Sequence, residues 1–245
     1  MQTNLYEELA HYWHRLTPPE DYRGEVAAIA SGIYDHLPFD EDKRYRLLEL
    51  GAGGGHSIFH LKHLFDCTAL DIAQPMLDAS LEINPDVKHV RGDMRDANLG
   101  ELFDVVIGHD AIDYMTSQAD ARAAVRTAAK HLRAGGLALI APTYTTETFV
   151  DGASASDAHE KNSNDILSFT STIKYAENTK SQFYLEMLFD HALDGRVIRA
   201  KDKHLCGLFS RDFWERAMVD AGFKLLQSAQ LIETEEVQMF VGQKI

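Results

Sequence analysis

The sequence predicts an α/β protein with a central, mainly parallel sheet and an antiparallel sheet inserted near its C-terminal end. Between residues 46 and 142, short apolar segments alternate with amphipathic helical segments. This alternation requires a parallel sheet that helices cover on both faces. After residue 166 the apolar residues alternate with period two, and tight turns separate the runs, a pattern typical of an antiparallel meander.

Composition excludes several classes of protein. The chain has 245 residues, with 24 Lys and Arg against 38 Asp and Glu, a net charge of −14. Such a charge repels a phosphate backbone or an anionic membrane surface, so we expect neither a nucleic-acid nor a membrane partner. The N-terminus has no signal-peptide pattern and no apolar run is long enough for a membrane span, which predicts a cytoplasmic protein. Cys67 and Cys206 are expected to be buried thiols, with no disulfide and no metal site.

The expected elements follow from apolar spacing and from turn residues. Two helices open the chain, the first capped by Asn4 and stopped by Pro18 and Pro19. The region 143–165 is polar and is expected to be a loop. Parallel strands are predicted at 46–50, 67–71, 87–91, 102–107 and 137–142; helices at 4–16, 20–37, 56–65, 75–83, 118–132 and 210–221; antiparallel strands at 167–176, 181–192, 196–206, 223–232 and 237–243.

A glycine-rich loop follows the first strand and organises the predicted site. Gly51, Gly53, Gly54 and Gly55 allow a tight turn that brings bare N–H groups close to a ligand at the start of the next helix. A structural turn with no ligand is the alternative. The dinucleotide fingerprint requires glycine where this chain has His56, which disfavours a nicotinamide-dependent oxidoreductase.

Asp71 ends the second predicted strand, 20 residues after Gly51. A strand-helix-strand unit imposes about this separation, and a carboxylate there can accept both hydroxyl protons of a ribose. The alternative is an aspartate that faces solvent. Beyond the fourth strand, His109, Asp110 and Tyr114 lie in a loop at the carboxyl edge of the sheet, where open α/β sheets bind ligands. We therefore expect substrate contacts in that loop.

These motifs resemble those of the class I methyltransferases that depend on S-adenosylmethionine (SAM). The resemblance rests on Glu49 before the glycine loop and on the run Gly92-Asp93-Met94 after the third strand. Shorter matches at 147–152 and 204–209 are similar to the N,N-dimethyltransferases of nucleotide-linked amino sugars. The sequence departs from these enzymes at His109, Asp110 and Tyr114, which lie where substrate would bind. The resemblance therefore supports the fold and the cofactor more strongly than the identity of the acceptor.

The resemblance implies a Rossmann-like, seven-stranded methyltransferase sheet with an N-terminal helical lid and an inserted antiparallel β-meander. The implied division is a lid over 1–40, a SAM-binding core over 41–142, an insertion over 143–209 that covers the substrate or pairs with a second subunit, and a C-terminal part over 210–245 that completes the core. The residues implied in cofactor binding are Tyr12, Tyr22, Arg23, Glu49, Gly51, Ala52, Gly53, Asp71, Ile72, Met76, Gly92, Asp93, Met94 and His109.

The predicted reaction is in-line displacement of the SAM methyl group by a small-molecule acceptor, favoured to be an amine, with S-adenosylhomocysteine as the product. An amine must lose its proton before attack, so a base or a site that disfavours ammonium is expected. His109 and His204 are the candidate bases, Asp110 the orienting charge, and Tyr12 and Tyr114 the hydrogen-bonding wall. The alternatives are a small-molecule O-methyltransferase and a SAM-binding protein without transfer activity.

Overall fold

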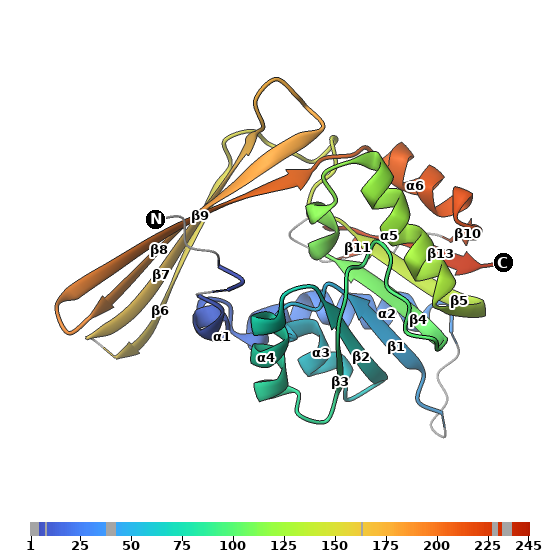
Figure 1. Ribbon diagram of the computed structural model, residues 1–245, viewed down its shortest axis with the longest axis horizontal. Helices are drawn as coiled ribbons and strands as arrows, with labels where there is room; N and C mark the ends of the chain where they lie inside the picture. Colours follow the sequence, from blue (N-terminus) through green and yellow to red (C-terminus); the bar gives the residue numbers. More distant parts are fainter. Residues whose placement is uncertain (1–4, 8, 38–42, 163, 227–229, 232–236) are drawn as a thin grey trace.

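The computed structural model describes residues 5–7, 9–37, 43–162, 164–226, 230–231 and 237–245 (Figure 1). Two sheets dominate this part of the chain. A seven-stranded sheet carries most of the helices, and a four-stranded sheet extends from one end of it. No helix among these residues combines the length and the apolar character that crossing a membrane requires.

The seven-stranded sheet confirms the predicted α/β class. Its strand order is β10-β13-β5-β4-β1-β2-β3, and β13 runs antiparallel to both of its neighbours while the other pairs are parallel. The order reverses between β1 and β4, so the carboxyl ends of these strands flank a crevice suited to a ligand. The strands are β1 (Arg46–Leu50), β2 (Asp66–Asp71), β3 (Lys88–Arg91), β4 (Phe103–His109), β5 (Leu132–Ala141), β10 (Phe223–Leu225) and β13 (Phe240–Lys244).

Helices cover both faces of this sheet and form two apolar cores. Helices α5 (Gln118–Lys130) and α6 (Arg211–Asp220) pack on one face, where Trp214 is buried with Phe103 and Val106. Helices α2 (Arg23–Tyr34) and α3 (His56–Leu61) pack on the other, where Ile29 and Ile58 are buried. Helix α4 (Gln74–Ile83) lies against β2 and β3. Burial of strand residues on both faces explains their continuous apolar runs.

The N-terminal segment, residues 5–22, differs from its prediction. Helical structure begins with η1 (Ala10–Tyr12) and α1 (Trp13–Leu16), followed by η2 (Pro19–Tyr22), whereas the spacing predicted one helix over 4–16. Asn4, its predicted cap, lies outside the described residues. Leu5 and Leu16 are buried against Leu167 and Met187 of the second sheet. The periodic spacing of these leucines therefore arises from packing on a sheet and does not require a continuous helix.

The second sheet has the order β6-β7-β8-β9 and is antiparallel throughout. Its strands are β6 (Ser154–Asn162), β7 (Asp165–Tyr175), β8 (Gln182–Leu193) and β9 (Arg196–Gly207). The last three confirm the predicted meander. The loop predicted over 143–165 is wrong, because β6 occupies much of it. This edge strand is mostly exposed and pairs on one side only, so it lacks the apolar alternation that marks a strand in a sequence.

Three further boundaries differ from the prediction. Strand β5 starts at Leu132 instead of 137, because a register shift between Phe103 and Val105 lets β4 pair with residues on both sides of the predicted glycine turn. Helix α3 ends at Leu61 rather than at residue 65. The two predicted C-terminal strands are divided into β10, β11 (Gln230–Leu231), β12 (Val237–Gln238) and β13, with residues 227–229 and 232–236 outside the described part.

Candidate functional site: a cavity between the sheet edge and the N-terminal segment

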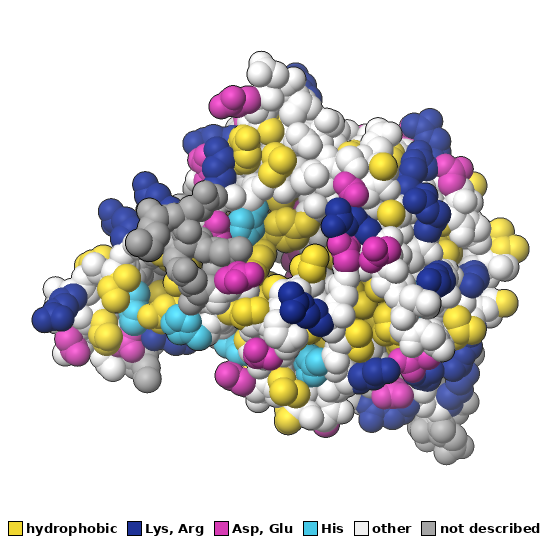
Figure 2. Space-filling view, viewed as in Figure 1, with side chains coloured by type: hydrophobic (Ala, Val, Ile, Leu, Met, Phe, Trp, Pro, Cys, Tyr) yellow, Lys and Arg dark blue, Asp and Glu magenta, His cyan; other side chains and the backbone are white. Residues whose placement is uncertain are grey.

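A cavity of about 500 Å³ opens at the carboxyl ends of β1, β2, β3 and β4. Its outer walls come from elements far away in the sequence, since Tyr6 and Trp13 of the N-terminal segment and His204 of β9 also line it. Figure 2 shows a hollow near the middle of one face of the molecule, bordered by hydrophobic and histidine side chains. The core sheet, the N-terminal segment and the second sheet therefore share one site.

The glycine loop forms the floor of the cavity. Gly51 has φ +79°, and a Cβ atom there would lie 2.3 Å from Cβ of Ala111. A Cβ atom on Gly54 would lie 2.1 Å from the ring of Trp13. A side chain at either position would fill the space where the loop meets the cavity walls, so the loop needs glycine for close approach as well as for its turn.

The N-terminal segment contacts this loop through aromatic side chains. Trp13 Nε1 donates to Nδ1 of His56 over 3.1 Å, and Tyr22 stacks on the His56 ring with centroids 4.8 Å apart. Burial lowers the pKa of His56 to about 4, so its neutral ring can accept this hydrogen bond at neutral pH. The residue that breaks the dinucleotide fingerprint therefore joins the N-terminal segment to the glycine loop.

Asp71 faces the cavity from the end of β2, beside the glycine loop. Its Oδ2 accepts from Gly53 N over 2.8 Å, and its Oδ1 accepts from Ala73 N over 2.8 Å. A carboxylate oxygen has two lone pairs, so each oxygen can still accept a hydroxyl proton. Burial raises the pKa of Asp71, and these backbone donors act against that rise.

Part of the cavity wall is apolar. Met76 and Met94 are buried in it, whereas Ile72 is 60% exposed at the border of the cavity. Asp93 also lines the cavity and accepts from Arg95 Nε at 3.0 Å with both oxygens, and these bonds lower the pKa of Asp93. A flat ring with a polar edge matches this arrangement of two thioethers, one branched chain and one carboxylate.

Residues 47–136 match a family described as "Methyltransferase domain". A Streptomyces venezuelae dTDP-3-amino-3,4,6-trideoxy-alpha-D-glucopyranose N,N-dimethyltransferase is 28% identical over 209 residues, 84% of this chain and 85% of its own. The structure of Streptomyces venezuelae DesVI superposes with TM-score 0.83 at 25% identity and covers all of both chains. The chain is a class I SAM-dependent methyltransferase.

Other relatives extend the comparison. A Streptomyces fradiae dTDP-3-amino-3,6-dideoxy-alpha-D-glucopyranose N,N-dimethyltransferase is 28% identical over 84% of this chain and 79% of its own. The sugar N-methyltransferase KedS8 from Streptoalloteichus superposes with TM-score 0.85 at 22% identity, covering 100% of this chain and 95% of its own, and shows the fold. The N-terminal helices and the four-stranded sheet of this methyltransferase thus belong to a fold that these enzymes share.

His109 ends β4 inside a cluster of acids. Its Nε2 lies 2.8 Å from Oε1 of Glu25 on α2 and 3.4 Å from Oδ1 of Asp110. Burial disfavours the imidazolium, but the charges of Asp110 and Glu25 outweigh burial and raise the pKa of His109 to about 10. The ring holds both protons at neutral pH, so it has no lone pair for a substrate proton. A role as base is thereby disfavoured for His109.

Tyr6, Tyr114 and His204 line a part of the cavity that we call the far wall, and Asp202 lies behind His204. These four side chains form a hydrogen-bonded chain that we call the inner chain. The Tyr6 and Tyr114 hydroxyls are 2.5 Å apart, and the Tyr114 hydroxyl lies 2.8 Å from Nδ1 of His204. His204 Nε2 lies 2.9 Å from Oδ2 of Asp202, which also accepts from Leu5 N over 2.5 Å. The structure thus brings together two predicted residues, Tyr114 from the short helix after β4 and His204 from β9 of the second sheet.

A second, shorter chain of the same residue types lies outside the cavity, and we call it the outer chain: Tyr12, His191 and Asp165. The Tyr12 hydroxyl lies 3.3 Å from Nδ1 of His191, whose Nε2 lies 2.8 Å from Oδ1 of Asp165. Tyr12 borders a separate hole of about 30 Å³ with mostly apolar walls. The sequence predicted that Tyr12 contacts the cofactor and the acceptor. In the structure, Tyr12 does not line the large cavity.

Two other predicted residues also lie off the cavity wall. Arg23 starts α2 with its side chain exposed. Glu49 is buried beneath the glycine loop, where burial raises its pKa to about 8, and its Oε2 has no hydrogen-bond partner among the described residues. The other predicted site residues all line the cavity: Tyr22, Gly51, Ala52, Gly53, Asp71, Ile72, Met76, Gly92, Asp93, Met94, His109, Asp110, Tyr114 and His204.

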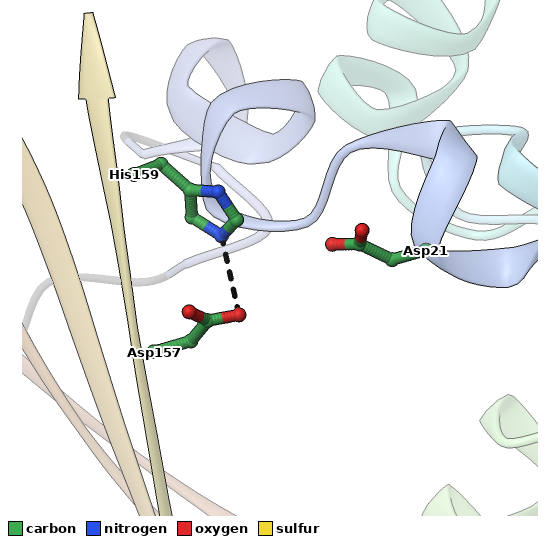
Figure 3. Close-up of side chains that lie close together, drawn as sticks. All are labelled: Asp21, Asp157 and His159. Carbon is green, nitrogen blue, oxygen red and sulfur yellow. Dashed lines mark ion pairs between the residues drawn. The ribbon is translucent and has the colours of Figure 1, made fainter.

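Sequence reasoning missed Tyr6, Asp202, Glu25 and Arg95 as site residues. Neither Tyr6 nor Asp202 belongs to a motif, and only the fold brings Tyr6 to the cavity and Asp202 to His204. Arg95 directly follows the run Gly92-Asp93-Met94 that carries the family resemblance, which was an available signal. Outside the cavity, Asp21 of η2 faces Asp157 and His159 of β6 (Figure 3), and His159 Nε2 lies 3.5 Å from Asp157 Oδ2. That cluster is largely exposed and joins no other feature of the site.

Proposed function

We propose that this methyltransferase transfers the methyl group of SAM to the amino group of a small, sugar-type acceptor that carries a nucleotide. The observation that carries this proposal is the polar far wall of the cavity, where hydrogen bonds join two phenols and an imidazole. Two curated relatives that act on dTDP-linked amino sugars, each aligned over 84% of this chain, support the acceptor class.

The residues that line the cavity are suited to bind SAM. The glycine loop would hold the methionine portion, Asp71 the ribose hydroxyls, and Met94 and Asp93 the adenine ring and its amino group. Glu49 Oε2, buried without a partner near the charges of Asp71 and His109, is suited to an amino group nearby. When bound, SAM supplies an electrophilic methyl group on a sulfonium.

The far wall suits an amine better than a hydroxyl. Burial raises the pKa of Tyr6 and of Tyr114, so both phenols stay neutral and protonated at physiological pH. Neutral phenol oxygens can accept hydrogen bonds from an amine and hold its lone pair toward the methyl carbon. Such positioning can lower a barrier by roughly 7–11 kcal/mol in favourable cases. A hydroxyl acceptor would need a stronger base than the wall offers.

The test is methyl transfer to matched acceptors. The purified protein is incubated with SAM and a dTDP-linked 3-amino-3,6-dideoxy sugar. A parallel incubation uses SAM and the same sugar nucleotide with a 3-hydroxyl group, and the masses of the products are measured by mass spectrometry. We expect one or two added methyl groups on the amino sugar and none on the hydroxyl analogue. Methylation of the hydroxyl analogue would establish O-methyl transfer instead. Binding of S-adenosylhomocysteine with no methylation of either would contradict the proposed acceptor.

A further inference from the structure

The Asp202 carboxylate contacts both the N-terminal segment and the imidazole in the cavity wall. Asp202 is 6% exposed, and its Oδ2 accepts from Leu5 N and lies 2.9 Å from His204 Nε2, while Oδ1 accepts from Lys203 N. Since a carboxylate only accepts, Nε2 of His204 must carry a proton. The imidazole in its neutral form therefore has its lone pair on Nδ1, toward Tyr114.

This tautomer sets the direction of the remaining hydrogen bonds. Nδ1 of His204 accepts from the Tyr114 hydroxyl, so the Tyr114 oxygen accepts from the Tyr6 hydroxyl. Both phenol donors therefore point toward His204, and both phenols border the cavity. Because burial keeps the phenols neutral, they can pass a proton on but cannot retain a negative charge. His204 is the acceptor at the end of the chain.

We propose that the inner chain is a proton relay that deprotonates the acceptor ammonium, with Asp202 as the residue that positions His204 and completes the relay only when the N-terminal segment is docked. This inference rests on the proposed function, because it needs an acceptor that enters as an ammonium. It assigns Asp202 and Tyr6 roles that no sequence motif indicates.

Every proton transferred along the inner chain is accounted for. The ammonium gives one proton to the Tyr6 oxygen, the Tyr6 proton passes to Tyr114, and the Tyr114 proton passes to Nδ1 of His204. Each phenol ends with one proton, His204 becomes an imidazolium beside Asp202, and the amine regains its lone pair. That lone pair then forms the new N–C bond while the C–S electron pair passes to sulfur. His204, with 12% of its side chain exposed, returns the proton to water afterwards.

The groups that face His204 are few in the described part of the chain. Asp202 faces it from β9, Tyr114 from η3 (Ala111–Tyr114) and Tyr6 from the N-terminal segment. Cys206 and Asp113 lie beyond Tyr114, and burial raises the pKa of both, which favours their neutral forms. Asp202 is thus the main charge on His204.

The first test reads the tautomer without any acceptor. In the full-length protein labelled with 15N-histidine, we expect the neutral His204 ring to carry its proton on Nε2, with the signal assigned by its loss in His204→Gln. Asp202→Asn should change this tautomer or make it a mixture, whereas Asp165→Asn in the outer chain should leave it unchanged. A neutral His204 protonated on Nδ1, or one that Asp202→Asn does not alter, overturns the relay whatever the acceptor is.

The second test reads the pH profile of methyl transfer to the amino sugar nucleotide. His204→Gln should lower kcat/KM by roughly 10²–10⁴-fold at pH 7, the usual contribution of a general base. The deficit should shrink as pH rises toward the pKa of the acceptor amine, since the free amine needs no relay. A deficit that is the same at every pH means a structural role and overturns the relay. If the wild-type protein methylates no amine, the proposed function is wrong. The tautomer of His204 from the first test then still shows whether the hydrogen bonds of the inner chain have the inferred directions.

Discussion

The inner and outer chains join the same parts of the molecule with the same residue types, yet only one borders the cavity. Each links an aspartate and a histidine of the second sheet to a tyrosine of the N-terminal segment, the inner one through Tyr114. The difference lies in the surroundings of the carboxylates. Asp165 already pairs with Arg15 Nη2 at 2.8 Å, while among the described residues no Lys or Arg pairs with Asp202. A compensated carboxylate fastens two elements, and an uncompensated one beside a cavity can stabilise a transferred proton.

The largest expected effect comes from breaking the inner chain at its centre. Tyr114→Phe removes the hydroxyl that joins Tyr6 to His204, and we expect kcat to fall by roughly 10²–10³-fold. Tyr12→Phe removes the equivalent hydroxyl of the outer chain and should change kcat by less than about threefold. Steady-state kinetics with the amino sugar nucleotide measures both, and calorimetric titration with S-adenosylhomocysteine should show unchanged affinity in each. Equal losses in the two variants would contradict the comparison.

His109 sharpens the comparison, because it borders the cavity and belongs to neither chain. Its folded pKa of about 10 lies above the unfolded value, so its ion pairs stabilise the fold fully below about pH 6.5 and progressively less as pH rises through 10. His109→Gln should therefore lower the free energy of unfolding by an amount on the order of 2–5 kcal/mol at pH 6, and by far less at pH 10. Urea unfolding at both pH values measures this. A loss that does not depend on pH would show that His109 is neutral in the fold.

Asp71 separates cofactor binding from the relay. Asp71→Asn keeps one acceptor oxygen but removes the charge, and hydrogen bonds to charged groups contribute about 1.5–3 kcal/mol. We expect S-adenosylhomocysteine to bind roughly 10- to 100-fold more weakly by calorimetry, while the tautomer of His204 stays as in the wild type. Wild-type affinity in this variant would contradict the ribose role of Asp71.

The smallest kinetic effect is expected in the outer chain. Asp165→Asn weakens the pairing with Arg15 and His191, which holds the N-terminal segment to the second sheet. Amide hydrogen exchange of residues 9–16 should become faster because local opening becomes easier, and kcat should change by less than about threefold. Arg15→Gln is the matched variant and should have the same effect on exchange. Faster exchange with a loss of kcat as large as that in Tyr114→Phe would assign the outer chain a role in turnover.

Much of the fold followed from local pattern. The strands at β1, β2 and β4 were predictable because both faces of each are buried, which leaves a continuous apolar run. Strand β6 was not, because this exposed and mostly polar edge strand carries no apolar alternation. The first helix was overextended because packing on a sheet and packing along one helix face can give the same leucine spacing.

The sequence by itself determined the parallel core, the glycine loop and Asp71, because consecutive residues of one crossover unit encode these features. Tertiary structure alone decided which polar residues meet at the far wall. Tyr6, Tyr114 and Asp202 are separated by as many as 196 residues, and their contact exists because the second sheet and the N-terminal segment pack over the same sheet edge. It also decided between two histidines that look equal in the sequence. Neighbouring acids keep His109 protonated, whereas a single carboxylate and a phenol leave His204 able to accept a proton.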